Sequence, residues 1–315
     1  MSNTLSATGT TVIFAALVSA MAFGQARAEV VENAYFVNPL PQFPAWRLIG
    51  DCMAERAEEL DIDLTETGPT DGTLNTNMMI QQIQQGISNE VDALITFPAS
   101  DGFVPQLEQA AAADIIVGTL YGAGYTASAS QTNVGADFGQ IGQIMVEALG
   151  GREGDQNVGL LVQGPSGPGN EFEEGFRAAA GNAENVNVIA VAYTEDNPAK
   201  ALDQSNALLA ANPDINVIAS HMGTATQGAS ATIKSRGMVG DVVVLANGAA
   251  GGGQEGLEDG TVYRIMMQDL CNAGAQILQG VVDLGEDKEV PAQIDVGIRM
   301  FSADEVQEYL DQGWQ

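Results

Sequence analysis

The chain has few side chains of the kinds that perform covalent chemistry. It contains one histidine, His221, and two cysteines, Cys52 and Cys271, whose spacing carries no metal-binding signature. The glycine-rich run GAAGGGQEG at 248–256 matches neither GxGxxG in the required place nor GxxxxGK followed by Ser or Thr. No GxSxG nucleophile elbow with partner groups is present either. The sequence therefore argues against an enzyme and predicts no cofactor and no metal site.

Amide, glycine and aromatic residues form a second set, and these types suit the non-covalent recognition of a small solute. They stand directly after predicted strands, where the loops of an open parallel sheet form its binding crevice. Aromatic faces stack on the C–H faces of a sugar ring while polar side chains bond its hydroxyl groups. The loops are nearly free of Lys and Arg, and they span residues 38–46, 97–101, 120–125, 163–170, 221–226, 247–253 and 268–269.

The elements that must position these loops follow from the hydrophobic pattern. From Asn33 onward, short β-rich runs alternate with longer amphipathic stretches, which predicts parallel α/β architecture. The first array has predicted strands at 34–38, 62–66, 93–97 and 115–119 and helices at 45–60, 74–88 and 104–113. The second has strands at 157–162, 186–193, 217–219 and 242–246 and helices at 138–149, 171–180, 199–211 and 225–236. Late additions are a strand at 262–267, a helix at 273–283, a strand at 295–300 and a helix at 303–311.

The charge of the chain excludes two classes of partner. It has 41 acidic against 11 basic side chains and a formal net charge of −30. A surface this negative repels phosphate backbones, so the sequence predicts no nucleic-acid partner. Anionic lipid surfaces are disfavoured for the same reason. The acidic residues are spread along the chain without long blocks, as on an acid-rich solvated surface; an acidic recruitment patch is the alternative.

Residues 1–28 have the pattern of a cleaved signal peptide. The apolar run at 11–24 is too short to span a bilayer comfortably, and Ala26 and Ala28 take the −3 and −1 positions that a signal peptidase needs. The pattern departs from the usual one because no Lys or Arg precedes Arg27. No cysteine stands directly after the cleavage site, which argues against a lipid anchor. We expect secretion to the periplasm and a soluble mature protein.

The two cysteines have two interpretations. In an oxidising compartment, Cys52 and Cys271 can pair and close a long loop. They can also be unpaired, as two small buried hydrophobic residues. The residues by themselves leave both interpretations open.

Six segments, taken in their order and spacing, resemble one family. They are FVNPLPQFPAWRLIGDCMAERAEEL at 36–60, the 43 residues from 68 to 110, EEGFRAA at 173–179, NPDINVIAS at 212–220, LEDGTVYRIMMQDL at 257–270 and GIRMFSADEVQEYL at 297–310. Together they make the chain similar to a type I periplasmic solute-binding protein of ABC transporters, of the ribose-binding type. The segment 68–110 is particularly similar to rhamnose-binding and autoinducer-2-binding receptors. The stretch 159–220 resembles periplasmic trimethylamine-N-oxide sensor proteins.

The resemblance implies an α/β fold of two doubly wound parallel-sheet lobes joined by a three-segment hinge, with ligand in the cleft and hinge closure on binding. It implies an N-terminal lobe of residues 29–135 plus 268–294 and a C-terminal lobe of 136–267 plus 295–315. The late strand and helix return to the first lobe, so the helix with Cys271 is expected beside the first helix, which carries Cys52. The resemblance thus favours a disulfide between them.

Site residues are also carried over from the resemblance. Asn38 and Phe43 take first-turn positions where the family places ligand contacts. Trp46 fits an aromatic contact there, and its alternative is packing on its own lobe. Asn247 stands at a strand end where ribose-type receptors carry Asp, and Gln268 aligns with a Gln that bonds sugar hydroxyls.

The chain also departs from the family at several contacts. His221 takes the place of an Asn, with a surface-loop histidine as the alternative. The family's sugar-clamping Arg is Phe172 here, its Asp-Arg pair is Leu120-Tyr121, and Phe97 replaces an Asn. The lost charges disfavour an ordinary aldopentose and suggest a less hydroxylated solute, such as a deoxy sugar or furanone-like compound, or a small cation boxed by aromatics. The candidate ligand contacts are Asn38, Phe43, Trp46, Tyr121, Asn170, His221, Asn247 and Gln268.

The implied function is the periplasmic substrate-binding protein of an ABC uptake system for a sugar, polyol or similar small neutral solute. The alternative is a sensor subunit that presents a bound solute, such as trimethylamine-N-oxide or autoinducer-2, to a membrane histidine kinase. The expected partners are therefore a small ligand and either a permease or a sensor kinase, and we expect a monomer.

Overall fold

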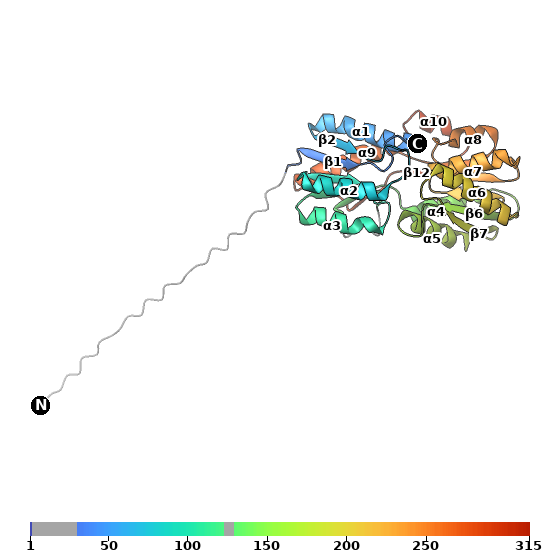
Figure 1. Cartoon of the computed structure of the whole chain (residues 1–315), viewed down its shortest axis with the longest axis horizontal. Helices are drawn as coiled ribbons and strands as arrows, with labels where there is room; N and C mark the ends of the chain where they lie inside the picture. The colour runs from blue at the N-terminus through green and yellow to red at the C-terminus, as the bar shows by residue number, and fades with distance from the viewer. Residues whose placement is uncertain (2–29, 123–128) are drawn as a thin grey trace.

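The computed structural model describes Met1 and residues 30–122 and 129–315. The predicted signal peptide, residues 1–28, lies outside the described residues except for Met1. Figure 1 shows two lobes side by side, with the C-terminus between them. Throughout the two described ranges, no helix has both the length and the hydrophobicity to cross a membrane.

The first lobe is built on a parallel sheet with the strand order β11-β5-β4-β3-β1-β2. Helix α1 packs on α9 and α2 packs on α3, and Figure 1 shows the two pairs on opposite sides of the sheet. The strands are β1 (Asn33–Val37), β2 (Asp63–Thr67), β3 (Ala93–Thr96), β4 (Ile116–Leu120), β5 (Thr132–Val134) and β11 (Gln293–Ile294). The helices are α1 (Pro44–Leu60), α2 (Thr76–Ser88), the 3-10 turn η1 (Asp101–Phe103), α3 (Val104–Ala112) and α9 (Leu270–Gly285).

The second lobe repeats this plan with the strand order β12-β10-β9-β8-β6-β7, in which only β12 is antiparallel to its neighbour. Helix α4 packs on α5 and α6 packs on α7, while α8 lies against β10. The strands are β6 (Gln156–Val162), β7 (Val186–Tyr193), β8 (Val217–Ser220), β9 (Val243–Asn247), β10 (Val262–Gln268) and β12 (Ile298–Phe301). The helices are α4 (Phe138–Leu149), α5 (Pro168–Ala180), α6 (Pro198–Ala211), α7 (Gly223–Ser235), α8 (Gly253–Asp259) and α10 (Val306–Leu310).

Central strands of both sheets are buried on both faces, which explains why they are continuous apolar runs in the sequence. In β3, Ala93, Leu94 and Ile95 are all fully buried, and in β9 the same holds for Val244 and Leu245. Because helices cover both faces, a ligand can reach these strands only at their ends, and in open parallel sheets the binding crevice lies at the carboxyl ends.

The chain crosses between the lobes three times, at 135–137, at Asp269 and at 295–297. The predicted fold class, two doubly wound lobes joined by three segments, is confirmed. Two expectations differ from the structure. The late strand, expected to return to the first lobe with the helix that follows it, is β10, which pairs with β9 and β12 and therefore stays in the second lobe. The strand expected at 295–300 is replaced by β11 and β12, which belong to different sheets because the third crossing lies between them.

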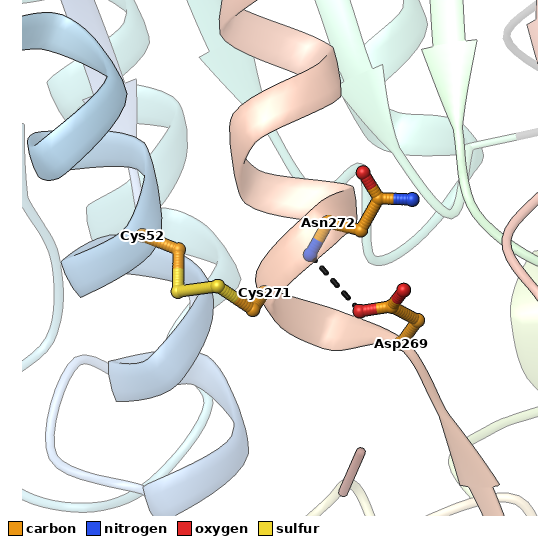
Figure 2. Close-up of a disulfide and its surroundings, with 4 residues drawn as sticks. All are labelled: Cys52, Asp269, Cys271 and Asn272. Carbon is orange, nitrogen blue, oxygen red and sulfur yellow. Dashed lines mark hydrogen bonds between the residues drawn. A yellow bond between two sulfur atoms is a disulfide. The ribbon is translucent and has the colours of Figure 1, made fainter. Parts of the chain in front are cut away.

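A disulfide joins Cys52 of α1 to Cys271 of α9, with Cα atoms 5.2 Å apart (Figure 2). Helix α9 begins immediately after the second crossing. Its N-terminus is capped by Asp269, whose Oδ1 accepts a hydrogen bond of 3.2 Å from the backbone N–H of Asn272. The disulfide therefore ties the start of α9, and with it the end of the second crossing, to α1.

The same two helices approach each other closely at Gly274. A Cβ at Gly274 would lie 2.3 Å from the carbonyl oxygen of Ile49, a backbone atom of α1. We expect Gly274→Ala to lower the free energy of unfolding by about 1–3 kcal/mol, as overpacking does. Gly280→Ala in the same helix is the matched control, because its Cβ would meet only side-chain atoms, the nearest 3.4 Å away. Urea unfolding should find Gly280→Ala neutral or slightly stabilising; equal losses in both variants would contradict the close contact.

Candidate ligand-binding site

A cavity lies between the two lobes. The volume of this cavity is about 100 Å³. Both lobes contribute to its wall. The lining residues are Leu40, Phe43, Ala45, Trp46, Ile49, Phe97, Tyr121, Phe138, Gln163, Asp196, His221, Met222, Gly223, Thr224, Asn247, Gly248, Ala250, Gln268, Leu270 and Gln315.

Six of the predicted contacts are therefore brought together on one cavity: Phe43, Trp46, Tyr121, His221, Asn247 and Gln268. Asn170 and Asn38 are not among the lining residues. Asn170 lies in the first turn of α5, where its Nδ2 donates a hydrogen bond of 3.0 Å to Glu174 Oε1.

Asn38 is fully buried beneath the first turn and bonds to the protein itself. Its Nδ2 donates to the carbonyl oxygen of Trp46 at 3.1 Å and to Glu66 Oε1 at 2.8 Å, and its Oδ1 accepts from Leu40 N–H at 3.0 Å. Arg47 holds the same Glu66 carboxylate with two bonds of 3.1 and 2.7 Å. In this arrangement Asn38 fixes the first turn of α1, which carries Trp46.

A chain of aromatic rings forms one side of the cavity. The Trp46 ring lies 5.3 Å from Phe97 and 6.0 Å from Tyr121, edge-on to the latter. Tyr121 lies 6.2 Å from Phe138, which is 5.5 Å from His221. These spacings are within the range of favourable aromatic pairs, so the rings support one another as a continuous wall.

Four polar atoms on the lining residues have no hydrogen-bond partner within the described part of the chain. They are Tyr121 Oη, both ring nitrogens of His221 and Gln268 Oε1. The three residues are only 3–6% exposed. Buried polar atoms are almost always hydrogen-bonded, and leaving one unpaired costs about 1–3 kcal/mol. Their convergence on one cavity is the arrangement expected of a site that a polar ligand completes.

Tyr121 is held in a strained backbone conformation at the end of β4. Its φ of 56° is in the left-handed region, which a bulky residue rarely adopts. Burial raises the pKa of its phenol, and the charge of Asp269 raises it further, so the hydroxyl stays protonated. Backbone strain of this kind is concentrated at functional sites. Tyr121 thus offers the cavity a neutral hydroxyl.

His221 follows β8 and lies between aromatic rings of its own lobe. Its ring centroid is 4.8 Å from that of Phe172. Burial lowers the pKa of His221 to about 3, so the imidazole is neutral and has one N–H donor and one acceptor nitrogen. Asn247 Nδ2 donates a hydrogen bond to the His221 carbonyl oxygen, which links the ends of β8 and β9.

The burial of His221 predicts a loss of stability in acid. Between pH 6.5 and 3 the unfolded chain binds a proton that the folded chain does not, so the free energy of unfolding decreases as pH falls. From pH 7 to pH 5 this amounts to about 2 kcal/mol. We expect the free energy of unfolding of wild type minus that of His221→Asn, both measured by urea unfolding, to fall by that amount.

Wild type must be compared with His221→Asn because Glu171 changes the free energy of unfolding with pH in the opposite direction to His221. Burial, with the charges of Asp137, Asp101 and Glu174, raises the pKa of Glu171 to about 7. The ionised Glu171 therefore lowers the free energy of unfolding above pH 7, and this destabilisation is relieved as the pH falls towards 4.5. Glu171 is present in both proteins, so its effect cancels in the difference. A difference that stays constant from pH 7 to pH 5 would contradict the neutral, buried His221.

Sequence reasoning missed four polar lining residues: Gln163, Asp196, Thr224 and Gln315. Gln163 Nε2 donates a hydrogen bond of 2.9 Å to the carbonyl oxygen of Ala99, which joins the lobes directly. Gln315 pairs with Gln268 through two backbone hydrogen bonds of 2.8 and 3.0 Å. Gln163 and Thr224 lie within loops expected to reach the crevice. The loop after β7, which carries Asp196, was not among them.

The lobes also meet at Phe43, where a Cβ on Gly223 of the second lobe would lie 2.8 Å from the Phe43 ring. The two lobes are thus in contact at the wall of the cavity. Two doubly wound lobes that enclose such a cavity define a type I periplasmic binding protein. Residues 34–289 match the family described as "Periplasmic binding protein domain", and the chain belongs to this family.

Several solved structures share this fold with the chain at low sequence identity. One is GanP, a glucose-galactose binding protein from Geobacillus stearothermophilus, with a TM-score of 0.83, 18% identity and coverage of 88% of this chain and 99% of that chain. Another is an ABC transporter solute-binding protein from Actinobacillus succinogenes with bound D-allose. Its TM-score is 0.76 and its sequence identity 21%, and the match covers 88% of this chain and 99% of that chain. A chain of the XylFII-LytSN complex is also similar. Its TM-score is 0.79 and its sequence identity 18%, and the match covers 88% of this chain and 100% of that chain. No curated protein sequence matches the chain.

Proposed function

We propose that this chain is the periplasmic substrate-binding protein of an ABC uptake system, and that it binds a monosaccharide, polyol or similar small neutral solute between its lobes. The observation that carries the proposal is the set of unpartnered polar atoms of Tyr121, His221 and Gln268 on an aromatic-lined cavity. Aromatic faces for C–H surfaces and neutral polar groups for hydroxyls are the two things that recognition of such a solute requires.

Binding follows from the position of the cavity between lobes joined by three segments. Trp46, Phe97 and Tyr121 belong to the first lobe, and His221 and Asn247 to the second. A solute that contacts both sets stabilises the closed arrangement over an open one, by as much as its affinities for the two states differ. The hydrogen bond from Gln163 to the carbonyl oxygen of Ala99 links the lobes and further stabilises the closed state.

No catalytic role is assigned to the cavity. Its one histidine has a pKa of about 3, far below the range of an effective general base near neutral pH. We propose that the solute is bound and released unchanged.

The proposed location and partners are those that a substrate-binding protein of an uptake system requires. We infer that residues 1–28 direct export to the periplasm and are removed there, and that the mature monomer delivers its solute to a membrane permease. The similarity to a chain of the XylFII-LytSN complex favours a second candidate, a sensor subunit that passes its closed state to a membrane kinase.

Thermal melting of the mature protein against monosaccharides, deoxy sugars, polyols and osmolytes tests the proposal. A ligand at 100 times its Kd stabilises by about 2.7 kcal/mol, which raises Tm by about 5–10 °C for a protein of this size. Glucose, galactose and D-allose, the sugars of the similar proteins described above, are suitable first probes. Absence of a shift with every neutral solute would contradict the proposed function.

A further inference from the structure

We propose that Asp196 binds the ligand directly and makes the cavity selective for a solute that presents a hydrogen-bond donor, a hydroxyl or a protonated amine, over one that presents an anion. This inference rests on the proposed function of the cavity. It concerns a residue in a loop that the hydrophobic pattern had not placed at the crevice.

Asp196 lies on the wall of the cavity and is 9% exposed. It follows β7 by three residues and is brought to the cavity by the turn that precedes α6. Its Oδ1 accepts a hydrogen bond from the hydroxyl of Thr224, which is also a lining residue. In the described ranges no Lys or Arg forms an ion pair with it. A carboxylate has about four acceptor positions, so one bond leaves most of them unused.

The backbone at this turn is strained. Glu195 and Asp196 have φ values of 53° and 51°, so two successive non-glycine residues adopt the left-handed conformation. Each such residue is energetically costly and is retained where the surroundings or the function require it. The strained pair directs one side chain to solvent and the other to the cavity, since Glu195 is exposed and Asp196 is buried.

The other lining side chains leave Asp196 without compensation for its charge. No Lys or Arg is among the described residues that line the cavity, and His221 is neutral. Burying a carboxylate without a cation or several donors is unfavourable, and burial accordingly raises the pKa of Asp196. A ligand hydroxyl or ammonium group supplies the missing donor. A ligand carboxylate or phosphate supplies no donor to Asp196 at neutral pH and would be repelled by its ionised form.

Two matched variants separate ligand binding from support of the turn. Asp196→Asn keeps an oxygen that accepts from Thr224 but removes the charge. Glu195→Gln removes a charge from the adjacent residue, which has the same backbone conformation and a side chain 72% exposed. Circular dichroism and urea unfolding check that both variants fold.

The probes are two sets of hexoses that share a ring and differ in one group: glucose, glucosamine and glucuronate, and galactose, galactosamine and galacturonate. Titration calorimetry at pH 7 on wild type should find binding of a neutral or amino sugar and none of a uronate. Asp196→Asn should weaken that binding at least 10-fold, about 1.4 kcal/mol, and Glu195→Gln should not. Stronger binding of the amino sugar than of its neutral counterpart identifies the ammonium group as the donor; the reverse order identifies a hydroxyl.

The outcomes that overturn the inference differ from those that overturn the function. Equal affinity of wild type and Asp196→Asn for a sugar, or tight binding of a uronate by wild type, would refute the role of Asp196 and leave the solute-binding function in place. Failure of wild type to bind any sugar or polyol would refute the proposed function, and the inference with it.

Discussion

Replacing Cys52 and Cys271 together by serine will lower the free energy of unfolding by about 2–5 kcal/mol, the usual effect of removing a native disulfide. The bond joins residues 219 positions apart, so it closes a long loop and restricts the unfolded chain strongly. It also joins α1, which carries Trp46, to α9, which follows Gln268. At the size of this protein the expected fall in Tm is about 4–20 °C.

Thermal unfolding with and without dithiothreitol measures the effect and provides its control. Reductant should lower the Tm of wild type to that of the double variant and leave the double variant unchanged. Thiol titration of denatured, unreduced wild type should find no free thiols. Two free thiols, or a wild type that melts at the same temperature in reductant, would show that the bond does not form in the protein.

Trp46→Ala is expected to weaken binding of the best neutral sugar by 30- to 1000-fold, about 2–4 kcal/mol. The ring of Trp46 contacts both Phe97 and Tyr121, so its removal takes away a stacking face and loosens the rings beside it. Trp46→Phe should recover part of the affinity, because it restores an aromatic face of smaller area.

Tyr263→Ala is the matched control for this measurement. Tyr263 is an aromatic residue of β10 that does not line the cavity. Titration calorimetry should find its sugar affinity unchanged, while urea unfolding reports any loss of stability in either variant. Trp46 would be excluded as a ligand contact if its replacement by Ala left the affinity at the wild-type value in a folded protein.

Most of the fold could be predicted from hydrophobic periodicity alone. Helix α4 and strand β7 have the predicted bounds, because each has a long, regular pattern between clear turns. Strand β5 and helix α8 were not predicted. Strand β5 has three residues, too few to show a period, and α8 lies in the glycine-rich run, whose composition indicates a loop. Both elements depend on tertiary contacts more than on local preference.

The site was less predictable, because position after a strand says which loop reaches the crevice but not which way a side chain points. Asn38 has the type and place of a ligand contact, yet its amide bonds Trp46, Glu66 and Leu40. Asp196 was overlooked although it also follows a strand. Its backbone conformation, which brings it to the cavity, has no signature in a single sequence.

The order of the chain has a consequence for synthesis. The first lobe begins at β1 but needs α9 and β11, so the lobe encoded first is completed almost last. At about 5–20 residues per second, the 219 positions between the two cysteines take roughly 10–40 s to emerge. Throughout that interval the Cys52 thiol has no partner in its own chain. Since the sequence holds only two cysteines, its one wrong partner is a cysteine of another molecule.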